Sequence, residues 1–222
     1  MQLNPLLIVE GHIFGKLDGG LWLVDTGAPT SFGVGEFQLD GRSFRPASSY
    51  AGLTAESLSE LVHAPCAGLI GADILRNFDH LFDCAKSVWS VSVDELQAEG
   101  NTISLEQFMG IPIVGAEIAG DQHRVFFDTG AQLSYLQSDS LGNFPEVGRA
   151  EDFYPGIGRF ETETHMVEMG LGGQVFNLRC GRLPELLGAT LMMAGTSGIV
   201  GNAVMMDSVT GYFPRRSRLH LS

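Results

Sequence analysis

Two short segments of the chain place an aspartate directly after a run of apolar residues. The first reads Leu-Trp-Leu-Val-Asp-Thr-Gly-Ala and ends at Ala28, and the second reads Val-Phe-Phe-Asp-Thr-Gly-Ala and ends at Ala131. An apolar run that stops at Asp-Thr-Gly is typical of a buried strand that turns into a tight loop. Such a loop holds its carboxylate, Asp25 or Asp128, where burial and neighbouring groups can tune its acidity. Asp, Thr and Gly are common turn residues, so it is the presence of two copies that indicates function.

The similarity between the two segments extends along the chain. Residues 53–92 align without a gap onto residues 183–222, and their apolar positions match. Both copies contain an apolar-apolar-Gly sequence, which ends at Gly71 in the first and at Gly201 in the second. This internal repeat predicts two homologous lobes of about 100 residues each, which is a common domain size.

The combination of apolar-Asp-Thr-Gly-Ala with a later apolar-apolar-Gly resembles the aspartic proteases. The Ala after the Gly, and the Gly-Ala-Asp-Ile-Leu run over residues 71–75, are more similar to the retroviral type than to pepsin. Retroviral enzymes are dimers with one Asp-Thr-Gly per subunit, whereas pepsins carry both in one chain. The sequence therefore resembles a retroviral-type dimer fused into one polypeptide, and the matching loops cover about half of it. The resemblance implies an all-β, bilobal aspartic-protease fold with two pseudo-twofold-related lobes and short helices.

The resemblance also implies that Asp25 and Asp128 form a catalytic dyad. Two adjacent carboxyls cannot both ionise, so the ionised one accepts a proton from water while the protonated one donates to the carbonyl oxygen. The residues expected to support this dyad are Thr26, Gly27 and Ala28 in the first loop and Thr129, Gly130 and Ala131 in the second. The threonine hydroxyls are expected to lock the loops together, and the glycine amides to face the carboxylates. The alanines replace a Ser or Thr of pepsins whose hydroxyl favours the ionised carboxylate, so we expect a mildly acidic activity optimum.

Composition limits the other classes of function. The 29 glycines in 222 residues and the short alternating apolar runs favour an all-β protein with many turns. The net charge of −13, from 26 acids and 13 bases, argues against nucleic acid or an anionic membrane as a partner. No apolar run approaches the roughly 18–20 residues of a membrane span. His63 and Cys66 have no second pair at zinc spacing, and the glycine-rich segments lack a phosphate-loop Lys, so we expect no metal and no cofactor.

Two further features predict a cytoplasmic protein. Cys66, Cys84 and Cys180 are an odd number of widely spaced cysteines, which is typical of reduced, packed thiols. The first residues include no basic side chain and no cleavage pattern like that of a secretory signal.

The repeat predicts the domain boundaries. Residues 1–96 are expected to form the N-terminal lobe, residues 97–107 a polar linker, and residues 108–222 the C-terminal lobe. Residues 8–13 align onto residues 113–118, with small slips, as the strand that leads into the hairpin before each aspartate.

Local signals predict smaller elements in the first lobe. Asp40-Gly41 lies between alternating apolar residues and predicts a tight hairpin over residues 36–44. Thr54 is a favourable N-cap and predicts a short helix over residues 54–62.

The second lobe contains an extra segment. Between the aspartate and the downstream glycine there are 46 positions in the first lobe and 73 in the second, so the second has 27 more. This segment includes Gly-Ile-Gly, which resembles the tip of a retroviral protease flap, and glycine permits the positive φ of a hairpin tip. We therefore predict one flap near residues 150–166 and no counterpart in the first lobe, the reverse of pepsin. The flap residues expected to meet substrate are Tyr154, Gly156, Ile157 and Gly158.

The resulting prediction is an aspartic endopeptidase with a monomeric catalytic unit and an extended peptide or protein substrate between the lobes. The alternative is a catalytically weak or inactive peptide-binding module on the same fold, which the short, flap-less first lobe favours. The presence of both aspartates favours activity. A third hypothesis is an unrelated β protein whose two Asp-Thr-Gly turns lie far apart, and the separation of the two carboxyls decides it.

Overall fold

The structure is a computed structural model that describes residues 1–154 and 157–222, apart from the side chain of Leu186. Strands account for 52% of the residues and helices for 14%, so the prediction of a mostly β protein with few short helices is confirmed. In the part of the chain that the structure describes, every helix is too short or too polar to cross a membrane.

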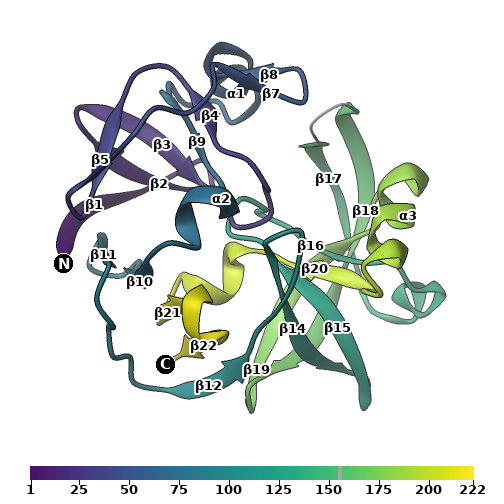
Figure 1. Cartoon of the computed structure of the whole chain (residues 1–222). Coiled ribbons are helices and arrows are strands. Elements are labelled where there is room, and N and C mark those ends of the chain that lie inside the picture. The colour runs from purple at the N-terminus through teal and green to yellow at the C-terminus, as the bar shows by residue number, and fades with distance from the viewer. Residues whose placement is uncertain (155–156) are drawn as a thin grey trace.

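Most strands belong to two large sheets (Figure 1). The strands of the larger sheet are β1 (Gln2–Val9), β2 (His12–Leu17), β3 (Gly20–Val24), β4 (Phe32–Gly33), β9 (Gly68–Ile70), β10 (Asp79–Asp83), β11 (Val88–Ser92), β12 (Asn101–Ser104), β21 (Val209–Phe213) and β22 (Arg218–Leu221). Their spatial order is β12-β22-β21-β10-β11-β1-β2-β3-β9-β4. Strands from the two ends of the chain therefore share one sheet.

The second sheet is built from the C-terminal half of the chain alone. Its strands are β13 (Glu106–Phe108), β14 (Ile111–Ile118), β15 (Asp121–Phe127), β16 (Ser134–Leu136), β17 (Glu146–Tyr154), β18 (Gly158–Leu171), β19 (Gln174–Gly181) and β20 (Gly198–Val200). Their spatial order is β13-β14-β15-β20-β16-β19-β18-β17, and β14 also pairs with β18.

The remaining elements are short. Two separate hairpins are formed by β5 (Phe37–Leu39) with β6 (Arg42–Phe44) and by β7 (Ser49–Tyr50) with β8 (Leu53–Thr54). The α-helices are α1 (Ala55–Leu61), α2 (Ala72–Leu75) and α3 (Glu185–Met193), and the 3-10 helices are η1 (Asp139–Asn143), η2 (Asn202–Met205) and η3 (Pro214–Arg216). The predicted hairpin turn at Asp40-Gly41 and the predicted Thr54 N-cap are both present.

The strands around the two aspartates have the same arrangement. β9 lies parallel to β3 and antiparallel to β4, and β20 lies parallel to β15 and antiparallel to β16. The amide of Asp25 donates a hydrogen bond to the carbonyl of Ile70 at 3.0 Å, and that of Asp128 donates to Val200 at 2.9 Å. Each aspartate is thus fixed to the end of the parallel strand beside its own.

The two segments that were aligned upstream of the aspartates are not equivalent in the structure. Residues 8–13 contain the turn Glu10-Gly11 between β1 and β2, whereas residues 113–118 lie within the single strand β14. The corresponding turn of the second half is Met109-Gly110, between β13 and β14. The alignment was wrong by six positions, because it pairs residues 105 apart whereas the two turns are 99 apart. Alternating apolar residues allow a shift by an even number of positions.

The segment predicted as a linker, residues 97–107, is partly strand. β12 pairs with β22 at the edge of the larger sheet, and β13 begins at Glu106. Ile103 and Leu105 are buried, and the amide of Leu105 donates to the carbonyl of Ser217 at 2.9 Å. These two apolar side chains alternate with polar ones, which is the period of a half-buried strand.

Antiparallel pairing between β10 and β21 joins the two halves of the chain. Packed rings surround this seam, with centroids 5.7–5.8 Å apart, and belong to His80, Phe82, Trp89 and Tyr212. Burial lowers the pKa of His80 to about 4, so its ring is neutral. The ring accepts a hydrogen bond from the Trp89 indole at 3.2 Å and donates one to the carbonyl of Leu75 at 2.8 Å. All of its hydrogen-bonding groups are therefore satisfied.

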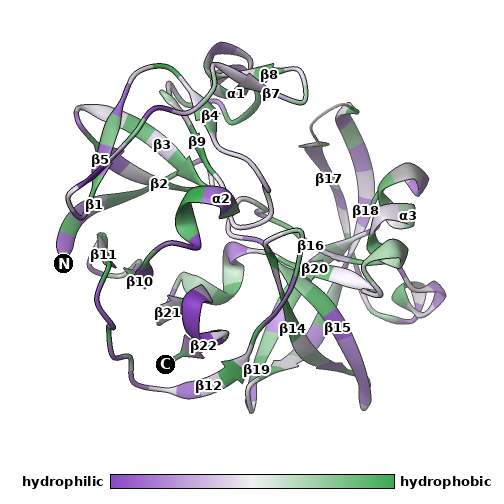
Figure 2. Ribbon diagram, in the orientation of Figure 1, coloured by the Kyte–Doolittle hydropathy of each residue, from purple (hydrophilic) through white to green (hydrophobic). Residues whose placement is uncertain are grey.

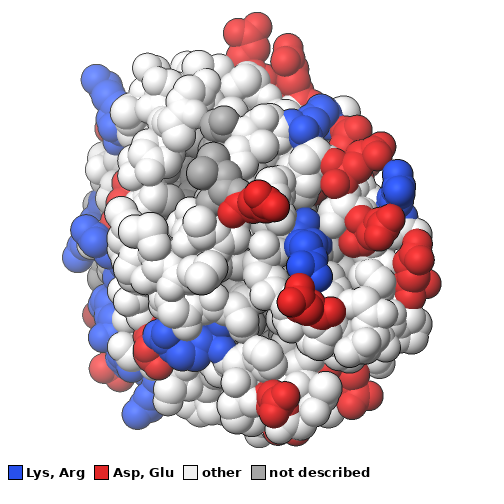
Figure 3. Space-filling view, turned by 90° about the vertical axis from the view of Figure 1, so that its right-hand side faces the viewer, with Lys and Arg blue, Asp and Glu red and all other residues white. Residues whose placement is uncertain are grey.

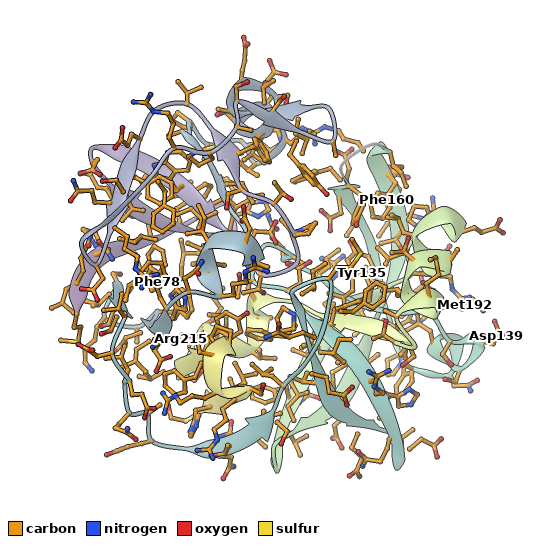
Figure 4. The ribbon with its side chains drawn as sticks, viewed as in Figure 1. Phe78, Tyr135, Asp139, Phe160, Met192 and Arg215 are labelled. Atoms are coloured by element: carbon orange, nitrogen blue, oxygen red, sulfur yellow. The ribbon has the colours of Figure 1, made fainter. Side chains whose placement is uncertain are left out.

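A buried ion pair lies at the same seam. Asp79 of β10 is completely buried, and its Oδ1 is 2.8 Å from Nη2 of Arg215, which is labelled in Figure 4. Its Oδ2 contacts Arg216 and also accepts the amide of Leu96 at 3.0 Å. An aspartate of the first half is thus neutralised by arginines of the second.

The largest apolar core also spans both halves. It contains Val24 and Ile70 from one half and Phe127 and Val200 from the other. Figure 2 shows hydrophobic stretches along β3, β9, α2 and β14. The strands that carry the two aspartates are therefore held by packing on both sides of the seam.

Candidate active site

Thr26 and Thr129 join the two Asp-Thr-Gly loops by reciprocal hydrogen bonds. The amide of each threonine donates to Oγ1 of the other at 3.0 Å. Each hydroxyl donates at 2.7 Å to a carbonyl of the opposite half, from Thr26 to Phe127 and from Thr129 to Val24. Both threonines are completely buried, so water cannot replace these bonds. The two loops are fixed against each other in a symmetric pattern.

Backbone amides orient the two carboxyls within their loops. In each loop Oδ1 of the aspartate accepts hydrogen bonds from the amides of the following Gly and Ala, at 2.8 and 2.9 Å in the first loop and at 2.9 and 3.3 Å in the second. Oδ2 of each aspartate remains available for other partners. Oδ1 of each carboxyl is therefore held by backbone amides in both halves of the chain.

The glycines of the loops allow the carboxyls to meet. A Cβ atom at Gly27 would lie 2.2 Å from Oδ2 of Asp128, and one at Gly130 would lie 2.4 Å from Cγ of Asp25. No larger residue fits at either position, so each carboxyl lies over the glycine of the opposite loop. The two carboxyls hydrogen-bond to each other. The hypothesis of two distant turns is therefore excluded.

Burial raises the pKa of both carboxyls. For Asp25 the charge of Asp128 and the hydrogen bond between them add to this effect, and the pKa lies well above its ordinary value. For Asp128 the hydrogen bond from Asp25 opposes the effect of burial on the pKa. Because the two carboxyls interact directly, their titration belongs to the pair.

Both carboxyls, which are half-buried, line a cavity of about 370 Å³. The apolar wall from the first half comprises Leu23, Phe32, Leu53, Leu58 and Leu69. The wall from the second half comprises Phe126, Tyr135, Phe160, Leu183, Leu187, Leu191 and Ile199. Tyr135 and Phe160, labelled in Figure 4, have ring centroids 6.3 Å apart. In such surroundings the charges of the carboxyls are less screened than in water.

The hairpin β17–β18 of the second half covers this cavity. Asp152, Phe153 and Tyr154 of β17 line it, and Phe153 packs against an apolar cluster of the first half. Nη2 of Arg159 donates to the carbonyl of Glu60 in α1 at 3.3 Å. Figure 1 shows this hairpin rising opposite α1, β7 and β8. The hairpin thus bridges from one half of the chain to the other.

The predicted flap residues lie in and next to this hairpin. Tyr154 lines the cavity, and burial, followed by the charges of Asp128 and Asp25, raises its pKa to about 12. Ile157 packs against an apolar cluster of the second half, and Gly158 has a φ of +85°, which favours glycine. Gly156 lies outside the described residues.

The first half contributes its own, shorter cover. Tyr50 and Ala51, at the turn between β7 and β8, line the same cavity. The first half was predicted to have no counterpart of the flap. Where the second half has the hairpin β17–β18, the first half has only the short connection of residues 34–36 between β4 and β5. The hairpin β7–β8, which comes later in the chain, reaches the cavity instead. The cavity is therefore covered from both sides, by hairpins of unequal length.

Several polar residues behind the two aspartates were not predicted from the sequence. Nδ1 of His12 is 3.2 Å from the carbonyl of Gly130, and Nε2 is 2.6 Å from the amide nitrogen of Gln132. Burial lowers the pKa of His12, so the neutral ring donates to Gly130 and accepts from Gln132. Asn202 donates to the carbonyl of Thr129 at 3.2 Å. These residues brace the second loop. The aligned repeat does not mark them, because it places His12 opposite Glu117 and Asn202 opposite Ala72.

Tyr135 and Asp152 form a second feature that was not predicted. The hydroxyl of Tyr135 donates a hydrogen bond to Oδ2 of Asp152. Burial and the charge of Asp152 raise the pKa of Tyr135, so the hydroxyl remains a donor. The repeat offers a signal for it, because Tyr135 follows Asp128 at the same distance as Phe32 follows Asp25. Both positions carry an aromatic ring, and the ring of the second half also carries a hydroxyl.

Other candidate chemistry finds less support. Among residues 1–154 and 157–222 there is no group of three or more His, Cys, Asp or Glu that could hold a metal ion. The three cysteines are free thiols, and burial raises the pKa of Cys84 to about 11 and that of Cys180 to about 12. These two thiols are therefore poor nucleophiles at neutral pH.

Comparison with known proteins gives no match to any family model and no similar sequence among curated proteins. The chemistry of the site therefore has to be inferred from its geometry.

Proposed function

We propose that the chain is an aspartic endopeptidase in which Asp25 and Asp128 form the catalytic dyad. The observation that carries this proposal is the pair of carboxyls, one from each half of the chain, that lie together at one covered apolar cavity. The resemblance of both loops to those of aspartic proteases supports it, as do the repeated strand pairings and the reciprocal threonine hydrogen bonds. We interpret the two halves as the two lobes of that fold.

The proposed reaction uses the two carboxyls in different protonation states. Asp128, ionised, takes a proton from a water molecule, whose oxygen attacks the carbonyl carbon of the scissile bond. Asp25, protonated, donates its proton to the carbonyl oxygen, which gives a tetrahedral diol. Asp128 then gives its proton to the amide nitrogen while a hydroxyl of the diol returns a proton to Asp25. The C–N bond breaks, and a carboxylic acid and an amine leave, with the dyad back in its starting state. No covalent bond to the protein is formed at any step.

The cavity supports a substrate in extended conformation. Its apolar walls lie on either side of the dyad, so that consecutive side chains of a peptide can point to opposite walls. The hairpin β17–β18 supplies a strand above the dyad, and its backbone can pair with an extended peptide. Because Arg159 and Phe153 fix this hairpin to the first half, it has to lift for a polypeptide to enter.

The test is cleavage of a reduced and alkylated protein, such as casein, by the purified chain between pH 3 and pH 8. We expect internal cuts, mapped by mass spectrometry of the new termini, that disappear in Asp25→Asn. Asp83→Asn is the matched control, because Asp83 pairs with Lys86 at the surface (2.9 Å) and is remote from the cavity. Peptide binding without new termini at any pH would favour the alternative of a non-catalytic binding module.

A further inference from the structure

The two walls of the cavity match in position but differ in chemistry. Leu23 corresponds to Phe126 and Phe32 to Tyr135 by their distance from the aspartates. Apart from Asp25 and from Tyr50 of the β7–β8 turn, the wall of the first half is formed by aliphatic and phenylalanine side chains and by glycine. The wall of the second half contains the Tyr135 hydroxyl and, facing it from the hairpin, the carboxylate of Asp152. The cavity thus has an apolar side and a side with an acidic group.

Asp152 is bonded by neutral donors only. Its Oδ2 accepts from the Tyr135 hydroxyl, and its Oδ1 accepts from the amide of Phe153 at 2.7 Å. Each carboxylate oxygen can accept a second hydrogen bond. Among the described residues that line the cavity there is no Lys, Arg or His. The half-buried Asp152 therefore has acceptor capacity left and no cation from the cavity wall to use it.

The acids on the outer surface of the hairpin are in a different situation. Glu151, the preceding residue, is exposed and pairs with Arg159 at 2.6 Å, and Glu163 pairs with Arg149 at 3.3 Å. In Figure 3, which views the side of the molecule on which these strands lie, acidic and basic side chains alternate over the surface. The charge inside the cavity is therefore not an extension of an acidic surface patch.

A carboxylate in an apolar wall is costly unless it is paired, and a ligand can supply the pair. One of the two residues of the scissile bond is bound by the wall of the second half. We propose that Asp152 selects substrates in which that residue is Lys or Arg. The opposite wall takes an apolar side chain. Asp152 is then a specificity-determining residue, and Tyr135 positions its carboxylate. This inference rests on the proposed endopeptidase function.

The main competing explanation is that the Tyr135–Asp152 bond only holds the hairpin to β16. Tyr135→Phe removes that bond and keeps the carboxylate. If the bond were purely structural, Tyr135→Phe and Asp152→Asn would slow the cleavage of all peptides to the same extent. If Asp152 recognises a cation, Asp152→Asn affects basic peptides selectively and Tyr135→Phe retains the preference for them.

The test uses synthetic peptides in which one residue of the scissile bond is Leu and the other is Lys, Arg, Gln, Leu or Glu, in both orders. We expect kcat/KM for Lys and Arg to exceed that for Gln by about tenfold or more in one of the two orders, which is the effect of a hydrogen bond to a charged group. Asp152→Asn should remove this preference, which means that kcat/KM falls about tenfold or more further for the Lys and Arg peptides than for the Gln and Leu-Leu peptides. Glu151→Gln, which removes the same charge one residue away, should leave the preference intact.

The outcomes separate this inference from the function on which it rests. Cleavage of the peptides with equal rates for Lys and Gln, or a Lys preference that survives Asp152→Asn, would overturn the role of Asp152 and leave the endopeptidase intact. No cleavage of any peptide or of casein by the wild-type chain would overturn both.

Discussion

The two halves of the chain agree where they hold the carboxyls and differ where they cover the cavity. Around each aspartate the strand pairings, the amide hydrogen bonds and the threonine contacts occur twice with nearly equal distances. Above the cavity, the first half supplies the two-residue strands β7 and β8, whereas the second half supplies β17 and β18, of 9 and 14 residues. The symmetric part positions the proposed chemistry, and the asymmetric part shapes what reaches it.

The same contrast exists away from the site. Lys86 and Arg216 occupy matching positions in the repeat. Lys86 pairs with Asp83 at the surface within its own half, while Arg216 crosses the seam to the buried Asp79. Equivalent positions of the repeat therefore have different partners. Substitutions at truly repeated positions should have equal effects in the two halves, and those at diverged positions should not.

The largest effect is expected at the dyad. Asp25→Asn and Asp128→Asn should each lower kcat/KM for peptide cleavage by about 10²–10⁴-fold, because each removes one of the two groups that transfer protons. The two losses should be similar, since the groups act as a unit. Steady-state kinetics on one peptide measures both, and a fully active variant at either position would remove that residue from the reaction.

The next largest effect is expected at the seam, where the halves are unlike. Asp79→Asn should lower the free energy of unfolding by about 3–5 kcal/mol, because it leaves two arginines without their buried partner. Asp83→Asn breaks an exposed pair and should cost about 1 kcal/mol or less. Urea unfolding of the two variants makes the comparison. Equal losses in the free energy of unfolding would show that the ion pair at the seam stabilises the fold no more than the surface pair does.

A smaller and symmetric effect is expected for the threonines. Thr26→Val and Thr129→Val each leave a buried amide of the other loop without an acceptor, which should cost about 1–3 kcal/mol. Thermal unfolding should give similar shifts for the two variants. A large shift for one and none for the other would contradict the reciprocal arrangement.

The smallest effect concerns the pH dependence of stability. The pKa of Asp25 is raised in the folded chain, so the folded state binds the proton more tightly than the unfolded state does. The resulting stability is complete below the ordinary pKa of an aspartate and is lost as the pH rises through the folded value. Asp25→Asn does not titrate, so its melting temperature relative to wild type should rise from pH 4 to pH 8. A constant difference would argue against the raised pKa.

Features that depend on local chemistry could be predicted from the sequence. The Asp40-Gly41 turn forms because both residues adopt positive φ, at 42° and 78°, as such a hairpin turn requires. Thr54 caps α1 by accepting the amide of Ser57 at 3.3 Å. The two aspartate loops could also be predicted, because each consists of a few consecutive residues directly after an apolar strand.

Features that depend on contacts between distant segments could not be predicted. His12 and Gly130 are 118 positions apart, and nothing near either of them marks the contact. The strand β12 lies in a polar stretch that becomes ordered by pairing with β22, at the other end of the chain. Asp152 acquires its place in the cavity through the path of the hairpin, and the exposed, arginine-paired Glu151 before it gives no indication of this place.

The most direct test of the central claim is the pH dependence of kcat/KM for one peptide, measured with the wild-type chain. If Asp25 and Asp128 work as one pair with a single shared proton, the profile should be bell-shaped, because activity requires one carboxyl ionised and the other protonated. Its maximum should lie at mildly acidic pH, since burial raises the pKa of both groups. A profile that peaks near pH 2–3, or one that rises continuously with pH and has no basic limb, would contradict it.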